Sequence, residues 1–182
     1  MMKEKMTNKE FKLMQGVMKL IDKVSPHVSR KADSFGIQRG MTVVDYGCGP
    51  GRYTMEFARL VSSDGKVYAV DVLEIALQET QKNLRENGIN NVELKLAKEY
   101  DSGIENKAAD IVFAIDMFHH VQNTDAFLKE LHRIAKDDGL LVLSGGHQTR
   151  STVKRNIAKS GLWEIANENK SFLMYKKIKC RA

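Results

Sequence analysis

The sequence has few of the residues that build disulfide frameworks, linkers or membrane spans. Its 182 residues include only two cysteines and two prolines, so neither a disulfide scaffold nor a proline-rich linker is expected. No apolar run is long enough to cross a bilayer, and lysines and glutamates interrupt the first twenty residues, where a signal peptide would need an apolar segment. These absences predict a cytoplasmic protein built as one domain.

The net charge differs in sign between the ends and the middle of the chain. Residues 1–40 have a net charge of +5, residues 41–146 of −6 and residues 147–182 of +7. The basic ends are either solvated faces or surfaces that meet an anionic substrate or nucleic acid. Charge alone does not separate these alternatives.

A strand that runs into a glycine-rich turn dominates what is present. Residues 43–51 read Val-Val-Asp-Tyr-Gly-Cys-Gly-Pro-Gly, and a helical pattern follows from Tyr53 to Val61. Glycine tolerates positive φ and lets a ligand approach the backbone closely. A strand, a glycine turn and a helix in this order are typical of the nucleotide-binding end of an open α/β sheet.

Strand and helix patterns alternate along the chain. Strands are expected at 41–46, 67–71, 92–97, 110–116, 140–144, 163–167 and 172–177, and helices at 8–23, 27–35, 53–61, 75–84, 124–135 and 149–159. This order predicts a Rossmann-like, doubly wound α/β fold with seven strands, mostly parallel, and a C-terminal hairpin that leaves one strand antiparallel. The N-terminal helices, within residues 1–35, are expected to form a lid in the same domain as the cofactor-binding residues 36–182.

The glycine spacing does not fit a dinucleotide. The G-x-G-x-x-G pattern needs a glycine where Arg52 stands, and Asp45 precedes the glycines where a pyrophosphate would bind. A nicotinamide oxidoreductase is therefore disfavoured. Asp71 ends the second expected strand and Asp116 the fourth, so three carboxylates are expected around one crevice. A carboxylate in that position can accept hydrogen bonds from the two hydroxyls of a ribose.

Three segments resemble a known family. Residues 43–51 resemble the first motif of class I S-adenosylmethionine-dependent methyltransferases, hydrophobic–hydrophobic–Asp–x–Gly–Cys–Gly–x–Gly. Residues 110–121 are similar to the fourth-strand segment of the small-molecule branch that includes ubiquinone/menaquinone-biosynthesis-type enzymes, and residues 127–143 resemble the helix, turn and strand that follow. The resemblance implies methyl transfer from S-adenosylmethionine to a small-molecule acceptor, and we expect a monomer or a homodimer.

The resemblance also implies which residues hold the cofactor. Asp71 would hold the ribose, Val72 would pack on the adenine, and the glycine loop would wrap the methionine part. Asp116 and Met117 would lie near the methionine end, and Tyr53 either covers this end or is an ordinary helix residue. The complete set is Asp45, Gly47, Cys48, Gly49, Gly51, Tyr53, Asp71, Val72, Lys98, Glu99, Asp116 and Met117.

One position departs from the family pattern. The family commonly has Gly-Asp at 97–98, where the Asp accepts a hydrogen bond from the adenine amino group, whereas this chain has Ala97-Lys98. A lysine ammonium cannot accept that bond. Either Glu99 or a backbone carbonyl takes its place, or the adenine is held more loosely.

Methyl transfer needs a general base only when the acceptor atom carries a proton. The candidates are His119, His120 and His147, each of which either faces the acceptor or has a packing or capping role. Because adjacent side chains point in different directions, at most one of His119 and His120 is expected to face the crevice. No cluster of histidines and carboxylates with ligand spacing accompanies them, so no metal site is expected.

Nucleic acid and membranes are not the expected partners. Methyltransferases that act on base amino groups usually have Asp/Asn-Pro-Pro-aromatic after the fourth strand, where this chain has Asp116-Met-Phe-His119. Two other functions stay open. One is a non-catalytic module that binds S-adenosylmethionine or S-adenosylhomocysteine, and the other is a methyltransferase acting on an anionic macromolecule through the basic ends.

Overall fold

A seven-stranded sheet forms the centre of the computed structural model, which describes residues 27–178. Its strands are β1 (Thr42–Tyr46), β2 (Lys66–Asp71), β3 (Val92–Leu96), β4 (Ala109–Ala114), β5 (Ala135–Leu143), β6 (Trp163–Glu168) and β7 (Leu173–Lys177). They lie in the order β3-β2-β1-β4-β5-β7-β6. Strands β1 to β5 pair in parallel and β7 is antiparallel to both of its neighbours, β5 and β6. The predicted fold class is confirmed, including the one reversed strand.

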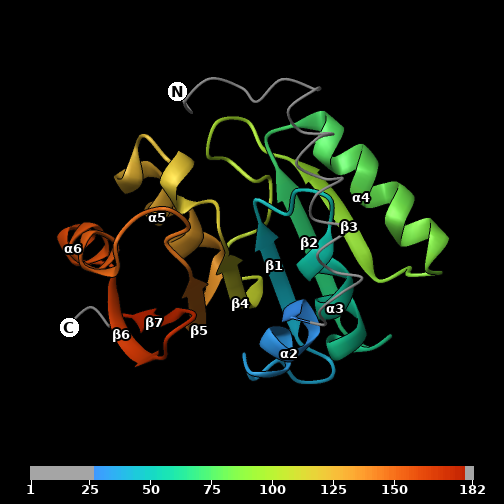
Figure 1. The fold of residues 1–182 in the computed structure, drawn as a ribbon, viewed down its shortest axis with the longest axis horizontal. Coiled ribbons are helices and arrows are strands. Elements are labelled where there is room, and N and C mark those ends of the chain that lie inside the picture. Colours follow the sequence, from blue (N-terminus) through green and yellow to red (C-terminus); the bar gives the residue numbers. More distant parts are fainter. Residues whose placement is uncertain (1–26, 179–182) are drawn as a thin grey trace.

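Helices cover both faces of this sheet (Figure 1). They are α2 (His27–Asp33), α3 (Arg52–Val61), α4 (Glu74–Glu86), α5 (Thr124–Ile134) and α6 (Arg150–Ser160), with a short 3₁₀ helix, η1 (Phe118–His120), after β4. Helices α2, α3 and α4 pack on one face, and α5 and α6 pack on the other. The helix predicted at 8–23 lies outside the described residues. Within residues 27–178, no helix is both long and apolar enough to cross a membrane.

The side chains of β1 alternate between the two faces of the sheet, and apolar residues on both faces suit its central position. Val43 packs among the side chains of α2 and α3, whereas Val44 and Tyr46 pack on the other face with α5. Both valines are fully buried. A strand with two buried faces needs apolar residues on both, which the Val-Val pair supplies.

An aromatic cluster fixes α2 to the sheet. The ring of Phe35 lies 4.9 Å from that of Phe113 in β4 and 5.0 Å from that of Phe172, and the rings of Phe57 and Phe113 stack at 4.2 Å. Phe35 is only 1% exposed. Burial of a side chain of this size contributes about 1.5–3 kcal/mol, so Phe35 helps to hold the end of α2 on the sheet.

Two predicted boundaries differ from the structure. The strand expected at 140–144 begins earlier, since β5 starts at Ala135 and has a register irregularity before Leu140. Asp138 and Gly139, residue types that are typical of a turn, therefore lie inside this strand. At Gly139 a Cβ would lie 2.9–3.0 Å from backbone atoms of Lys136 and Ala109. The turn residues therefore bulge without leaving the sheet, because glycine allows this close approach. The fourth strand ends at Ala114, so Asp116 belongs to the loop that follows it.

A loop replaces a helix between β3 and β4. Residues 97–108 are held to the α5 face by hydrogen bonds, among them the three that follow. The Tyr46 hydroxyl donates to the Tyr100 carbonyl (2.8 Å), the Ser102 hydroxyl donates to Glu130 (2.5 Å), and Arg133 donates to the Ile104 carbonyl (2.7 Å). This loop therefore has a fixed course beside the ends of β1 and β2.

Candidate active site

The glycine loop lies at the carboxyl edge, by which we mean the edge of the sheet where the parallel strands end. The amides of Gly47 and Cys48 both donate to the carbonyl of Val70 at the end of β2, at 2.8 and 3.0 Å. Gly47, Gly49 and Gly51 all have positive φ, between 54° and 81°. This is the left-handed region that favours glycine, so the predicted reason for the three glycines agrees with the backbone.

The three glycines differ in what they face. A Cβ at Gly47 would lie 2.7 Å from Cγ of Met117, and one at Gly51 would lie 2.8 Å from Thr80. A Cβ at Gly49 would meet nothing within 4 Å. The loop is therefore packed at both ends and open at its centre. A ligand that needs close contact with the backbone fits at Gly49.

Two residues of helix α4, which the sequence analysis did not select, hold the glycine loop in place. The Thr80 hydroxyl donates to the carbonyl of Gly49 at 2.8 Å, and the Asn83 amide donates to the carbonyl of Pro50 at 2.8 Å. Both side chains are buried. In the sequence, both are polar residues on the apolar stripe of α4. Because buried polar groups are generally hydrogen-bonded, this pair was the available signal for a contact with the loop.

Asp45 supports the loop from inside the protein. Its side chain is 3% exposed and accepts a hydrogen bond from the Thr54 hydroxyl of α3 at 2.6 Å. Burial raises the pKa of Asp45 to about 6, the hydrogen bond from Thr54 opposes this shift, and the nearby charge of Asp71 adds to it. Cys48, in the same loop, is also buried, and burial raises the pKa of its thiol.

Asp71 joins the loop to the end of β2. Its Oδ2 accepts from the Gly49 amide and its Oδ1 from the Leu73 amide, both at 2.9 Å. Burial raises the pKa of this carboxyl, and the backbone donors oppose the shift. Two carboxylate oxygens offer about four acceptor positions, so Asp71 can accept further hydrogen bonds beside the open face of Gly49.

The predicted adenine-side residues flank Asp71. Val72 is partly buried, and the amide of Ala97 donates to the Asp71 carbonyl at 2.9 Å. Lys98 and Glu99 are exposed in a tight turn closed by reciprocal backbone hydrogen bonds between Lys98 and Asp101. Glu99 has a φ of 56°, a conformation that costs a non-glycine residue about 1–3 kcal/mol.

Asp116 and Met117 lie on the other side of the loop. Asp116 is exposed with a φ of 57°; its amide donates to Oγ of Ser144 (2.8 Å), and the Ser144 hydroxyl donates back to its carboxylate (2.6 Å). Burial lowers the pKa of Lys31 on α2, and the charge of Asp116 opposes this shift. The Lys31 amine also lies 5.7 Å from the centroid of the Tyr53 ring. Tyr53 therefore lies where α2 meets α3.

The three candidate histidines come together. The rings of His119 and His120 lie 3.9 Å apart and those of His119 and His147 lie 4.8 Å apart, between centroids. The two adjacent side chains do not point apart, because their rings, tilted by 42°, lie against each other in the 3₁₀ turn η1. That at most one of them faces the crevice stays a prediction. Burial, His120 and His147 lower the pKa of His119, whereas Asp116 raises it.

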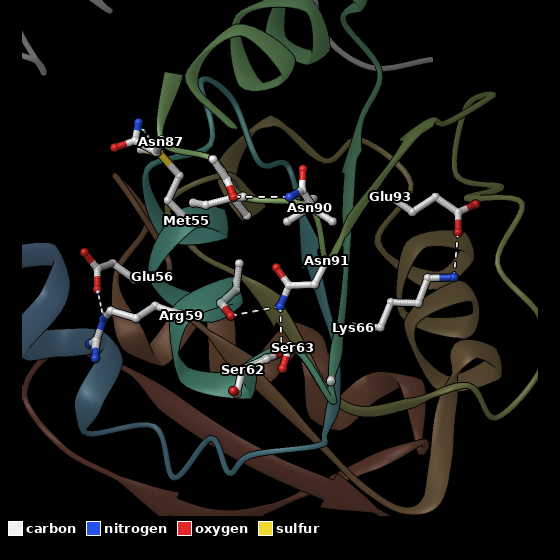
Figure 2. Close-up of a pocket in the computed structure, with 15 residues that line it drawn as sticks. Met55, Glu56, Arg59, Ser62, Ser63, Lys66, Asn87, Asn90, Asn91 and Glu93 are labelled. Atoms are coloured by element: carbon white, nitrogen blue, oxygen red, sulfur yellow. Dashed lines mark hydrogen bonds and ion pairs between the residues drawn. The ribbon is translucent and has the colours of Figure 1, made fainter. Parts of the chain in front are cut away.

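A large groove lies at the opposite, amino edge, where the strands begin. It encloses about 1050 Å³ between the ends of α3 and α4 and the starts of β2 and β3. Figure 2 shows Asn91 donating toward the end of α3, to the Ala58 and Ser62 carbonyls, and Lys66 paired with Glu93 at 2.7 Å. None of the predicted site residues lines this groove. Across residues 27–178, no group of three His, Cys, Asp or Glu side chains is arranged to hold a metal.

Known proteins share this arrangement. Residues 37–177 match a family model described as a methyltransferase domain. Over 112 residues the chain is 32% identical to the ubiquinone/menaquinone biosynthesis C-methyltransferase UbiE of Escherichia coli O1:K1, an alignment that covers 61% of this chain and 45% of UbiE. The chain therefore spans less than half the length of the curated relatives it matches.

Two solved structures have the same fold. An S-adenosylmethionine-dependent methyltransferase from Aquifex aeolicus is 25% identical, with a TM-score of 0.72 over 81% of this chain and 87% of that one. A protein from Methanococcus maripaludis is 20% identical, with a TM-score of 0.81 over 98% of this chain and 97% of that one. The second likeness concerns the fold alone.

Proposed function

The chain belongs to the class I S-adenosylmethionine-dependent methyltransferases, and from that premise we propose that it methylates a small-molecule acceptor. The bound cofactor supplies a methyl group activated by a positively charged sulfur. The protein supplies position and charge. The observation that carries the proposal is the glycine loop, which is packed at both ends and open at Gly49. Beside Gly49 lies Asp71, whose carboxylate can accept further hydrogen bonds.

We assign the residues around the loop as follows. Asp71 accepts from the ribose hydroxyls, Val72 packs on the adenine, and Lys98 and Glu99 flank its edge. Gly47, Cys48, Gly49 and Gly51 wrap the methionine part, together with Asp116, Met117 and Tyr53. Asp45 acts indirectly, because its carboxylate is engaged by Thr54 and holds the loop in place.

The lid is part of the same proposal. The lid is assigned to residues 1–35, and the cofactor-binding part of the domain to residues 36–182. Of this lid only residues 27–35 lie within the described range. Burial lowers the pKa of Lys31 and the charge of Asp116 opposes this shift, and this electrostatic interaction between α2 and the loop after β4 supports the assignment.

The acceptor class rests on the curated relatives. UbiE carries the name of a C-methyltransferase of ubiquinone and menaquinone biosynthesis, which is small-molecule chemistry. A small acceptor also agrees with the sequence after β4, which lacks the Pro-Pro-aromatic segment of base-amino methyltransferases.

A thermal-shift comparison tests the proposal. A ligand that binds only the folded protein stabilises it by about 2.7 kcal/mol at a concentration of 100 Kd. We expect S-adenosylmethionine and S-adenosylhomocysteine to raise the Tm and NAD to leave it unchanged. Transfer of a labelled methyl group to low-molecular-weight acceptors must then follow. Binding without transfer would favour a non-catalytic module, and the absence of any shift would overturn the proposal.

A further inference from the structure

We propose that His119 is the general base that removes a proton from a hydroxyl acceptor in the crevice, with Gly146 as the residue that positions its ring. This inference rests on the proposed function and narrows it to acceptors whose oxygen must lose a proton, such as phenols and enols. It is carried by the convergence of two loops at the carboxyl edge.

The two loops follow neighbouring strands. His119 lies in η1 after β4, and His147 lies in the turn after β5; these strands pair in parallel up to Ala114 and Leu143. Met117, two residues before His119, packs against Gly47 of the glycine loop. The histidine cluster therefore lies beside the end of the loop assigned to the methionine part, where the transferred methyl group would be presented.

Gly146 makes room for the His119 ring. Its φ is 57°, and a Cβ built there would lie 2.2 Å from Nδ1 of His119. Any other residue would have to displace the ring. The same nitrogen is buried and has no hydrogen-bond partner within the described part of the chain. Because Nδ1 is buried, Nε2 is the ring nitrogen left to meet a substrate, and it can accept a proton in the tautomer that carries the ring proton on Nδ1.

The surroundings favour the neutral form of this imidazole. The groups that act on it are His120 from the same turn, His147 from the next loop and Asp116 before η1; burial and the two histidines lower its pKa, and Asp116 raises it. Three imidazoles in contact do not all carry a proton, because like charges repel. A neutral imidazole with a carboxylate nearby can accept a proton and then be stabilised as a cation.

Only some acceptors use such a base. A neutral amine attacks with its own lone pair, whereas a phenol with a pKa of about 10 is almost entirely protonated at neutral pH. A positioned general base typically contributes 10²–10⁴-fold. The cluster therefore points to an acceptor with an acidic O–H group.

The transfer step balances without another reactant. The bond between the methyl carbon and sulfur breaks, its electron pair stays on sulfur, and the sulfonium becomes a neutral thioether. A bond forms between the methyl carbon and the acceptor oxygen, or a ring carbon made nucleophilic by that oxygen; in the second case the hydrogen on that carbon leaves as a proton and the oxygen regains one. The O–H proton moves to Nε2 of His119 and is later released to water.

The first test uses labelled methyl transfer to a panel of phenols, enols, amines and thiols. We expect hydroxyl compounds to be methylated, and His119→Gln to lower kcat on them by about 10²–10⁴-fold and to remove the acid limb of the pH profile. S-adenosylmethionine affinity, measured by calorimetry, should stay within about twofold, a change of less than 0.5 kcal/mol. An unchanged kcat and pH profile in His119→Gln, or methylation of amines and thiols only, would overturn the inference and leave the proposed function intact. A protein that binds the cofactor and methylates nothing would overturn both.

The second test separates positioning from folding. Gly146→Ala should reproduce the loss seen in His119→Gln and raise the pKa of His119 in an NMR titration, because the ring is displaced toward water. Gly103→Ala is the matched control, since Gly103 has a similar φ of 64° and open space around it. It should lose only the stability that left-handed strain costs, and keep both kcat and the titration. An unchanged His119 titration in Gly146→Ala would contradict the assignment.

Discussion

The two edges of the sheet differ in how their polar groups are satisfied. At the carboxyl edge, Asp45 and Asp71 are buried, Asp116 has a left-handed backbone, and Nδ1 of His119 has no partner in the described part of the chain. At the amino edge there is a groove of about 1050 Å³, in which Asn91 satisfies the end of α3 and Lys66 pairs with Glu93. Ser62 also has a positive φ there, but it ends α3 and its carbonyl accepts from Asn91.

The comparison teaches that volume alone does not mark the candidate site in this fold. Strained backbone does not separate the two edges either, because non-glycine residues with positive φ lie at both: Glu99 and Asp116 at the carboxyl edge, Ser62 and Lys107 at the amino edge. The buried carboxyls with raised pKa values, Asp45 and Asp71, lie at the carboxyl edge, and such shifts are typical of functional sites. The predictions below therefore set a change at one edge against a matched change at the other.

The largest effect is expected for Gly47→Val. A β-branched residue at a φ of 81°, with its Cβ 2.7 Å from Met117, combines left-handed strain with overpacking and costs about 2–5 kcal/mol. Gly88→Val in the groove has a φ of 64° and nothing within 4 Å, so only the strain of about 1–2 kcal/mol applies. Tm and calorimetric affinity for S-adenosylmethionine measure both. Equal losses of stability in the two variants, or an unchanged affinity for S-adenosylmethionine in Gly47→Val, would contradict the distinction between the edges.

Asp45→Asn should stabilise the cofactor-free protein above pH 6. The folded pKa of about 6 lies above the ordinary 3.8, so the carboxyl favours folding less as pH rises between these values, and the full loss is about 3 kcal/mol. Asparagine has no charge and can still accept from Thr54. We expect wild type and variant to differ near pH 8 and to converge near pH 4 in denaturant titrations.

Glu93→Gln at the amino edge is the control for that pH dependence. Lys66 and Lys95 lower the pKa of Glu93, so its contribution has the opposite sign and is lost as pH falls through the folded pKa. The pair is largely exposed, and its contribution is within about 0.5 kcal/mol. A stability gain in this variant as large as in Asp45→Asn would show that burial at the loop is not the cause.

Asp71→Ala should weaken cofactor binding by roughly ten- to a hundred-fold, because hydrogen bonds to a charged group contribute about 1.5–3 kcal/mol. The variant also frees the Gly49 amide. Asn91→Ala, which removes two hydrogen bonds at the amino edge, should lower the Tm and leave affinity unchanged. Calorimetry on both variants decides, and an unaltered Kd in Asp71→Ala would refute the ribose assignment.

The smallest effect is expected for Lys98→Asp. An acid at this exposed position can accept a hydrogen bond from the adenine amino group, with a gain of about 0.5–1.5 kcal/mol. Lys82→Asp, an equal change of charge on an exposed position of α4, should not alter the Kd. Weaker binding in Lys98→Asp would mean that the adenine lies elsewhere.

The glycine loop could be predicted because its information is local. The spacing of the glycines after Asp45 predicts the turn. The acids that follow two apolar strand patterns predict Asp71 and Asp116 as site residues. Thr80 and Asn83 could not be found in this way, since they contact backbone carbonyls 31 and 33 residues away. A threonine on a helix looks the same whether it caps a loop or only fills space.

The same limit applies to the histidines. His119 and His147 meet only because β4 and β5 are neighbours and both loops are short. The sequence names them as separate candidates, and the register of the sheet makes them one cluster. The predicted start of β5 was wrong for a related reason. Glycine is typical of a turn, but Gly139 instead allows a bulge within the strand.

The aromatic cluster also has a consequence for how the domain folds. Phe35 precedes the first strand of the sheet and Phe172 immediately precedes β7, yet their rings lie 5.0 Å apart. Contacts between distant parts of a chain raise contact order and slow folding, because the loop between them must close first. The first described helix is therefore expected to gain its native packing late, once the last strand has joined the sheet. A chain released from the ribosome would complete its crevice only after its C-terminal hairpin had been made.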